Sequence, residues 1–292
     1  MMPSSQKNKD KNSQSGSFLS TSAAEKYNLE HGDPQLMEKY YASSRPHLSN
    51  SQIKAYQRSP LLFTKRYITK DTPPMSITDA MKRGSLVDHL ITQPDVPHPY
   101  VPKSTADAKD HKPEHRMRTD MYEQAHAMAD RVTNSKMFKT LTSTKHVFQY
   151  PLTSTIHDVP ICGLADMVVF GPAAILIDIK TTQPSKINPR SWHYHCLDMG
   201  YYQQLALYKY MLREELDKRH PITTAHLIVS HKEDGYNPAA YYLIPEHLTD
   251  PHLQFAQSTI KEIAGHRDAN SWPTSEPNIE PENLLELINV NY

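Results

Sequence analysis

The sequence predicts a mixed α/β fold in which a central sheet is flanked by helices. Strand-like apolar runs recur along the chain, and short turn segments such as Gly171-Pro172 separate them. Helical patterns precede, interrupt and follow these runs, which favours a layered α/β architecture. The predicted strands are residues 145–155, 160–170, 173–181, 225–230 and 239–244.

The helical segments are predicted from apolar residues at helical spacing. Between residues 49 and 95, for example, Ala80, Gly84, Val87 and Ile91 fall on one helical face. Several prolines between residues 94 and 113 indicate a loop. The remaining predicted helices are residues 117–137, a long one over 192–218, and 245–265.

Composition divides the chain into three parts. Residues 1–48 are polar at first, and we expect a mobile arm there. Residues 49–267 carry the predicted helices and strands, and we expect them to form one domain. Residues 268–292 form an acidic tail.

The densest group of reactive side chains lies around the turn at residues 171–172. Asp166 belongs to the strand before this turn, and Asp178 and Lys180 belong to the strand after it. Residues two apart on a strand share a face, so Asp178 and Lys180 point the same way while Ile179 points into the core. Two carboxylates brought together need a cation between them, and Mg²⁺ accepts such hard oxygen ligands. The backbone carbonyl of Ile179 is a candidate further ligand, and Lys180 can hold or polarise an attacking water.

Two other motifs flank this group, and each is weak alone. His89 follows Gly84 on the early predicted helix, where a lone His is more often a satisfied, partly buried side chain than a ligand. Gln204 and Tyr208 are four residues apart on the long predicted helix and therefore share a face. An amide and a phenol there suit phosphate or base contacts, and they suit a structural hydrogen bond about equally well.

Taken in order, these motifs resemble the PD-(D/E)xK nuclease superfamily. The resemblance is to its branch of RecE (exonuclease VIII), the RecB nuclease domain and the mitochondrial genome-maintenance exonucleases, and it spans residues 49–244. The motifs are Gly84 to His89, Gly163 to Asp166, Asp178-Ile-Lys180-Thr181, and Gln204 to Tyr208. The fold that the resemblance implies is a restriction-endonuclease-like core.

The resemblance also implies a role for each residue. Asp166, Asp178 and the Ile179 carbonyl would bind the metal, with His89 near it or near the scissile phosphate. Lys180 would activate the water, so the implied catalytic residues are Lys180, Asp178, Asp166 and His89. The implied DNA contacts are Gln204, Tyr208, Gln149, Arg83 and Lys82. Gln149 departs from the family pattern, which often has Glu on this strand, and an amide binds Mg²⁺ less strongly than a carboxylate does.

The implied activity is a Mg²⁺-dependent exonuclease, in which Mn²⁺ can substitute, acting on duplex DNA ends with 5′→3′ polarity. By analogy it would be a phage-type recombination and repair enzyme with a single-strand annealing partner and a homo-oligomeric form. Two alternatives stay open. The first is a structure- or sequence-specific endonuclease, because the motif fixes the chemistry and not the substrate. The second is a non-catalytic DNA-binding protein on a degenerate nuclease fold, which Gln149 alone favours.

Charge and cysteine content are consistent with this interpretation. The chain has 32 Lys and Arg against 32 Asp and Glu, but residues 51–145 hold 16 against 10. This basic surplus could line a groove for phosphates. Two cysteines are too few for a four-cysteine iron–sulfur cluster and do not suggest a disulfide framework, so we expect a reducing cytoplasm. No stretch of about 18 apolar residues occurs, so we expect no membrane span.

Overall fold

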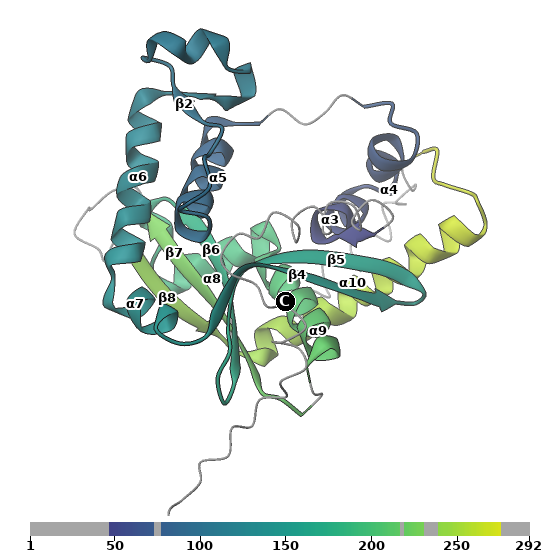
Figure 1. Cartoon of the computed structure of the whole chain (residues 1–292). Coiled ribbons are helices and arrows are strands. Elements are labelled where there is room, and N and C mark those ends of the chain that lie inside the picture. The colour runs from purple at the N-terminus through teal and green to yellow at the C-terminus, as the bar shows by residue number, and fades with distance from the viewer. Residues whose placement is uncertain (1–46, 73–76, 217–218, 231–238, 276–292) are drawn as a thin grey trace, which may run out of the picture.

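The fold of the chain is seen in a computed structural model, which describes residues 47–72, 77–216, 219–230 and 239–275. Groups of helices and groups of strands follow one another along it (Figure 1). The helices are α3 (Asn50–Arg58), α4 (Pro60–Phe63), α5 (Asp79–Thr92), α6 (Thr119–Asn134), α7 (Lys136–Thr142), α8 (Pro189–Met199), α9 (Tyr201–Glu215) and α10 (Glu246–Asp268). The strands are β1 (Leu48–Ser49), β2 (Val101–Pro102), β3 (Arg116–Met117), β4 (His146–Ile156), β5 (Val159–Val169), β6 (Ala174–Thr182), β7 (Ile222–Ser230) and β8 (Ala239–Ile244).

The main sheet is mixed, as the sequence predicted. Its strand order among the described residues is β1-β5-β6-β7-β8, and β4 pairs with β5 beside this path. The β4–β5, β5–β6 and β7–β8 pairs are antiparallel, whereas β1–β5 and β6–β7 are parallel. A parallel pair needs a crossover connection, and α8 and α9 supply it between β6 and β7. The predicted fold class is therefore confirmed.

Two hydrophobic cores cover opposite faces of this sheet. Side chains alternate along a strand, so Ala225, Leu227 and Val229 of β7 join the core beneath α5, α6 and α7. Ile222 and Ile228 of the same strand join the second core, which α8, α9 and α10 cover. Figure 1 shows α5, α6 and α7 grouped beside β6–β8, with α9 and α10 near the β4–β5 hairpin.

Two predicted helices are each broken into two. The helix expected over 192–218 divides at Gly200, which has φ 65° and caps α8 in the left-handed region. Glycine adopts this conformation without the clash that a Cβ would cause. The helix expected over 117–137 stops before Ser135, whose hydroxyl caps the next helix by accepting from the Phe138 amide. Capping of this kind competes with helix continuation.

The predicted ends of the chain lie mostly outside the described residues. Most of the arm at 1–48 and most of the acidic tail at 268–292 fall there, so both remain predictions, as do the boundaries of the expected domain. In the described part, α10 ends at Asp268, close to the expected end of the domain. None of the helices described here is both long and apolar enough to cross a membrane.

Candidate active site

The two predicted acidic residues lie where the sheet divides. The β5–β6 ladder runs from Val169↔Ile175 to Met167↔Ile177 and then stops. The next opposed positions would be Asp166 and Asp178, and beyond them β5 continues with β4 while β6 continues with β7. Asp166 bridges the opening, because its Oδ2 accepts a hydrogen bond from the Ile179 amide at 2.6 Å. The β5–β6 ladder therefore ends at these two acidic residues.

Lys180 forms an ion pair at this end of the ladder. Its Nζ lies 2.6 Å from Asp178 Oδ2, and it also lies over the Tyr201 ring at 4.9 Å from the centroid. Burial alone would lower the pKa of Lys180, but the carboxylates of Asp178 and Asp166 raise it above its ordinary value. The side chain therefore stays protonated while it is paired, and it acts as a hydrogen-bond donor.

Asp88 is a third acidic residue of the site, and the sequence analysis missed it. Burial raises its pKa to about 6, Lys180 opposes this shift, and Asp178 adds to it. Asp88 comes from α5, which approaches β6 closely at Gly84. A Cβ at Gly84 would lie 3.1 Å from Thr181 Oγ1. Residues four apart share a helical face, so the Gly84 contact directs Asp88 toward the sheet, and this spacing was the available signal.

The pKa values of the two strand carboxylates also indicate that acidic groups are crowded together here. Burial raises the pKa of Asp166 well above its ordinary value, and the charges of Asp88 and Asp178 raise it further. Burial raises the pKa of Asp178 as well, although Lys180 lowers it. Carboxylates held together out of water favour protonation or a bound cation.

Gln149 explains how Asp88 is held. The Gln149 amide donates to both oxygens of Asp88, at 3.3 and 3.2 Å, and to Thr92 Oγ1 at 2.8 Å. Its backbone has φ 50°, an unusual value for a residue other than glycine, and the β4–β5 ladder skips it opposite Asp166. Gln149 is 5% exposed. The residue that departs from the family pattern therefore orients a carboxylate supplied by the helix.

The Gln204–Tyr208 pair lies against the other side of the site. Gln204 Nε2 donates to the Tyr208 hydroxyl at 3.1 Å, so the two side chains share a face as predicted. Burial raises the pKa of Tyr208 to about 12, with a contribution from Asp178. Gly163 permits this packing, because a Cβ there would lie 2.3 Å from the Tyr208 ring. The Gly-x-x-Asp motif thus combines a close approach to α9 with the acidic residue.

His226 is a second residue that the sequence analysis missed. It is the β7 neighbour of Asp178 in the parallel ladder, and both residues are fully buried. Its Nε2 lies 3.7 Å from Asp178 Oδ2, and its Nδ1 accepts from Trp192 Nε1 at 3.2 Å. Burial and the charge of Lys180 lower the pKa of His226 to about 3, so the ring is neutral.

Three predicted site residues have their described contacts elsewhere. His89 Nε2 lies 2.7 Å from the Val96 carbonyl. Lys82 is buried and donates to the Pro113 and Arg116 carbonyls, and Arg83 donates to Gln124. Metal binding by His89 and DNA contact by Lys82 and Arg83 remain predictions. The contacts described for Lys82 and Arg83 link α5 to α6 and to the loop before it.

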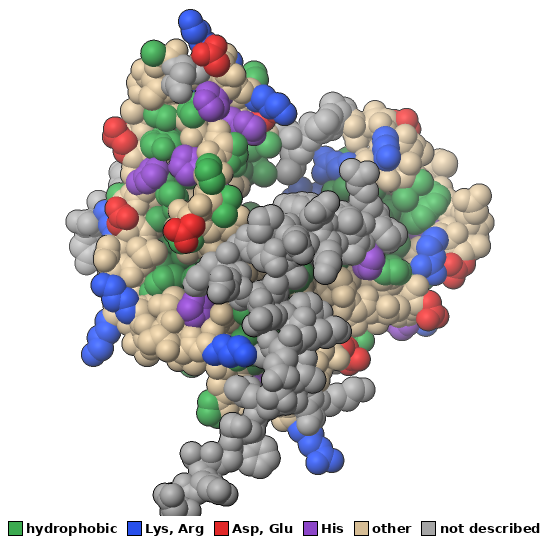
Figure 2. All heavy atoms as spheres, viewed as in Figure 1, with side chains coloured by type: hydrophobic (Ala, Val, Ile, Leu, Met, Phe, Trp, Pro, Cys, Tyr) green, Lys and Arg blue, Asp and Glu red, His purple; other side chains and the backbone are tan. Residues whose placement is uncertain are grey.

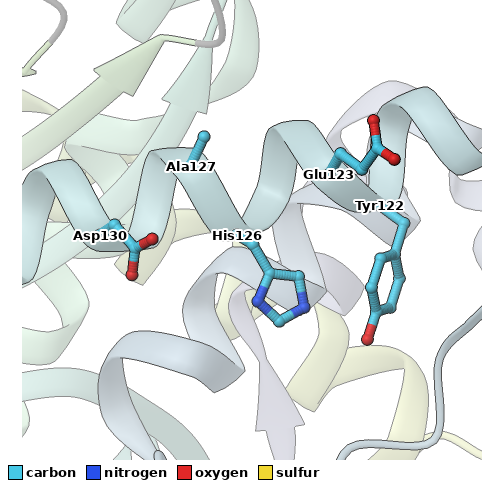
Figure 3. A pocket seen from close by; sticks show the side chains of 5 residues that line it. All are labelled: Tyr122, Glu123, His126, Ala127 and Asp130. Carbon is cyan, nitrogen blue, oxygen red and sulfur yellow. The ribbon is translucent and has the colours of Figure 1, made fainter.

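His89 belongs to a row of rings between α5 and α6. The His89 and His98 ring centroids are 5.9 Å apart, and those of His98 and His126 are also 5.9 Å apart. Figure 2 shows histidine side chains gathered over this part of the molecule. His126 also lines a pocket of about 440 Å³ with Tyr122, Glu123, Ala127 and Asp130 (Figure 3). All five of these residues come from α6, and none of them is one of the acidic residues Asp88, Asp166 and Asp178 of the candidate site.

The site offers oxygen atoms of the kind that bind a divalent cation. No group of three or more His, Cys, Asp and Glu side chains in the described ranges is arranged as a set of metal ligands. Lys180 Nζ instead lies against Asp178, as a cation would. The buried Asp178 Oδ1 has no hydrogen-bond partner among the described residues, and such an atom needs compensation by a cation or a donor. Hard oxygen ligands of this kind suit Mg²⁺.

Comparison with known proteins agrees with this geometry. Residues 49–281 match the family model described as a PDDEXK-like domain of unknown function (DUF3799). The chain belongs to this family. The PD-(D/E)xK resemblance is thereby confirmed, whereas the roles of the individual site residues remain predictions.

Solved structures show a similar fold. A Eubacterium rectale protein described as a "Putative exonuclease" aligns at a TM-score of 0.57, with 12% identity, over 87% of this chain and 97% of its own. A second protein, SSO0001, aligns over 49% of this chain and 64% of its own, with 14% identity and a TM-score of 0.29, which is too low to carry an argument. None of the curated proteins matches the chain by sequence.

Proposed function

We propose that this protein is a Mg²⁺-dependent DNA exonuclease that hydrolyses phosphodiester bonds at duplex ends. The observation that carries the proposal is the set of three acidic side chains around Lys180 where the sheet divides. Asp166 and Asp178 would hold the cation, with Asp88 and the Ile179 carbonyl as further oxygen ligands. The cation would supply charge neutralisation at the phosphate and a more acidic bound water. The exonuclease description of the Eubacterium rectale protein supports cleavage at ends over internal cleavage.

The protein residues would bind and orient the reacting groups. Lys180 Nζ would donate to the attacking water or to the phosphate, which stabilises the charge that develops there. Tyr208 and Gln204 would contact the DNA backbone from α9. The alternative of a non-catalytic protein rested on Gln149. The hydrogen bonds from Gln149 to Asp88 weigh against this alternative, because Asp88 of α5 supplies a carboxylate in place of the family's Glu at position 149.

Several finer features rest on family analogy. They are 5′→3′ polarity, use of Mn²⁺ in place of Mg²⁺, a role in recombination and repair with a single-strand annealing protein, a homo-oligomeric form, a phage origin, and action in the cytoplasm. The same site would also serve a structure- or sequence-specific endonuclease. Substrate topology distinguishes the two activities, because an exonuclease needs a DNA end.

The test is digestion of end-labelled linear duplex beside a covalently closed circle, with Mg²⁺ or EDTA. We expect Mg²⁺-dependent loss of the linear DNA alone, with no cleavage by Asp178→Ala or Lys180→Met. The matched control is Lys209→Met, because Lys209 of α9 is a buried lysine paired with Glu246 of α10. It should retain cleavage. Nicked circles would identify an endonuclease, and full activity in Asp178→Ala would contradict the proposal.

A further inference from the structure

The surroundings of Asp178 differ between its two oxygens. Neither oxygen has a well-directed hydrogen-bond partner among the described residues, but Oδ2 lies 2.6 Å from Lys180 Nζ and 3.7 Å from His226 Nε2. The β6–β7 ladder fixes this arrangement, because Asp178 and His226 are direct neighbours in parallel register. Both groups therefore approach the buried carboxylate on its Oδ2 side.

The tautomer of His226 follows from its second contact. Trp192 Nε1 is a donor only, so His226 Nδ1 must accept the 3.2 Å hydrogen bond between them. Cys196 Sγ lies 3.8 Å from the same nitrogen, and its protonated thiol can be a weak donor there as well. In the neutral ring the hydrogen consequently lies on Nε2, which faces Asp178. His226 is thus a donor toward the carboxylate and not a metal ligand.

We propose that His226 is a positioning residue for Asp178, and that Trp192 fixes its ring so that Nε2–H faces Oδ2 while Oδ1 is left for the cation. This inference rests on the proposed metal-dependent function. The 3.7 Å separation is longer than a hydrogen bond, and closing it requires a shift of about 0.7 Å. Because His226 is fully buried, its N–H dipole acts on the charge without competition from bulk water.

Metal binding without DNA tests the proposal directly. Isothermal titration calorimetry of the full chain with Mn²⁺ and with Mg²⁺ would compare His226→Met, which has no donor, with His226→Gln, which can place an amide N–H near the position of Nε2. Removing a group that orients a ligand typically weakens metal binding about 10–100-fold. We expect this loss for His226→Met and a loss of less than about threefold for His226→Gln. Wild-type affinity in His226→Met, or equal losses in both variants, would overturn the proposal.

A second pair of variants tests the contribution of Trp192. Trp192→Phe should weaken metal binding in the wild-type background but have no effect in the His226→Gln background, because no tautomer remains to be fixed. An equal effect in both backgrounds would overturn the proposal even if His226→Met does not fold. The matched control is Thr224→Val, a buried polar position on the same face of β7 that bonds the Ile244 carbonyl. It should bind metal as the wild type does.

Failure of the proposed function would look different from failure of this inference. Wild-type protein that binds neither ion, or Asp178→Asn that binds as tightly as wild type, would contradict the metal-dependent function itself. Wild-type binding that depends on Asp178 but not on His226 would contradict the positioning role alone.

Discussion

Replacement of Asp88 by Asn should stabilise the metal-free protein while reducing cleavage. Burial raises the pKa of Asp88 from its ordinary value of 3.8 to about 6. An acid with a raised folded-state pKa contributes stability below its ordinary pKa, and this contribution is lost as the pH rises through the folded-state value. At about 1.4 kcal/mol per unit, ionised Asp88 costs at most about 3 kcal/mol at pH 8. Asn removes this cost and keeps an oxygen that can accept from Gln149.

The assay is denaturant unfolding in EDTA at pH 4 and at pH 8. Between pH 4 and pH 8, ionisation of Asp88 should lower the wild-type free energy of unfolding by up to about 3 kcal/mol. This contribution to the pH dependence should be absent in Asp88→Asn. The exposed Asp120, which pairs with Arg118 on the surface, provides the control. Asp120→Asn should differ from the wild type by less than about 1 kcal/mol at either pH.

The functional half of this prediction distinguishes a site residue from a structural one. A carboxylate kept for metal binding lowers stability without metal and is needed for activity. Asp88→Asn should therefore cut Mg²⁺-dependent cleavage at least about tenfold. Loss of stability at pH 8 in EDTA, or undiminished cleavage, would refute the reasoning.

Three further predictions concern packing, DNA contact and metal. In denaturant unfolding, Gly163→Ala should lower the free energy of unfolding by about 1–3 kcal/mol, because the new Cβ would lie 2.3 Å from the Tyr208 ring. The control is Gly171→Ala, which should change this free energy little, because the nearest atom to its new Cβ would be at 3.5 Å. Lys82→Met should destabilise the fold by about 1.5–3 kcal/mol, because two carbonyls lose a charged donor. The salt dependence of its DNA binding tests the predicted DNA contact of Lys82: a slope reduced by about one would support a phosphate contact, and an unchanged slope would contradict it. Saturating Mg²⁺ at pH 8 should stabilise the wild type by about 2.7 kcal/mol at 100 times its Kd, and an unchanged midpoint would contradict cation binding at the carboxylates.

The sequence alone determined the parts of the site that depend on local geometry. Alternation along one strand places Asp178 and Lys180 together, and the short turn around Gly171-Pro172 folds Asp166 back beside them. Helical spacing likewise places Gln204 and Tyr208 on one face, where they hydrogen bond. These relations span few residues, so the sequence pattern was sufficient to find them, and the ordered motifs were sufficient to identify the family.

Only the tertiary structure decided which residues complete the site. Asp88 and its neighbour His89 have similar local signals, and the rotation of α5 on the sheet, set where Gly84 meets Thr181, turns Asp88 toward Gln149 and the carboxylates. His226 reaches Asp178 only because β7 pairs with β6 in a parallel register, across a crossover of some forty residues. Helix rotation and the register of distant strands arise from packing of the whole core, which no local periodicity encodes.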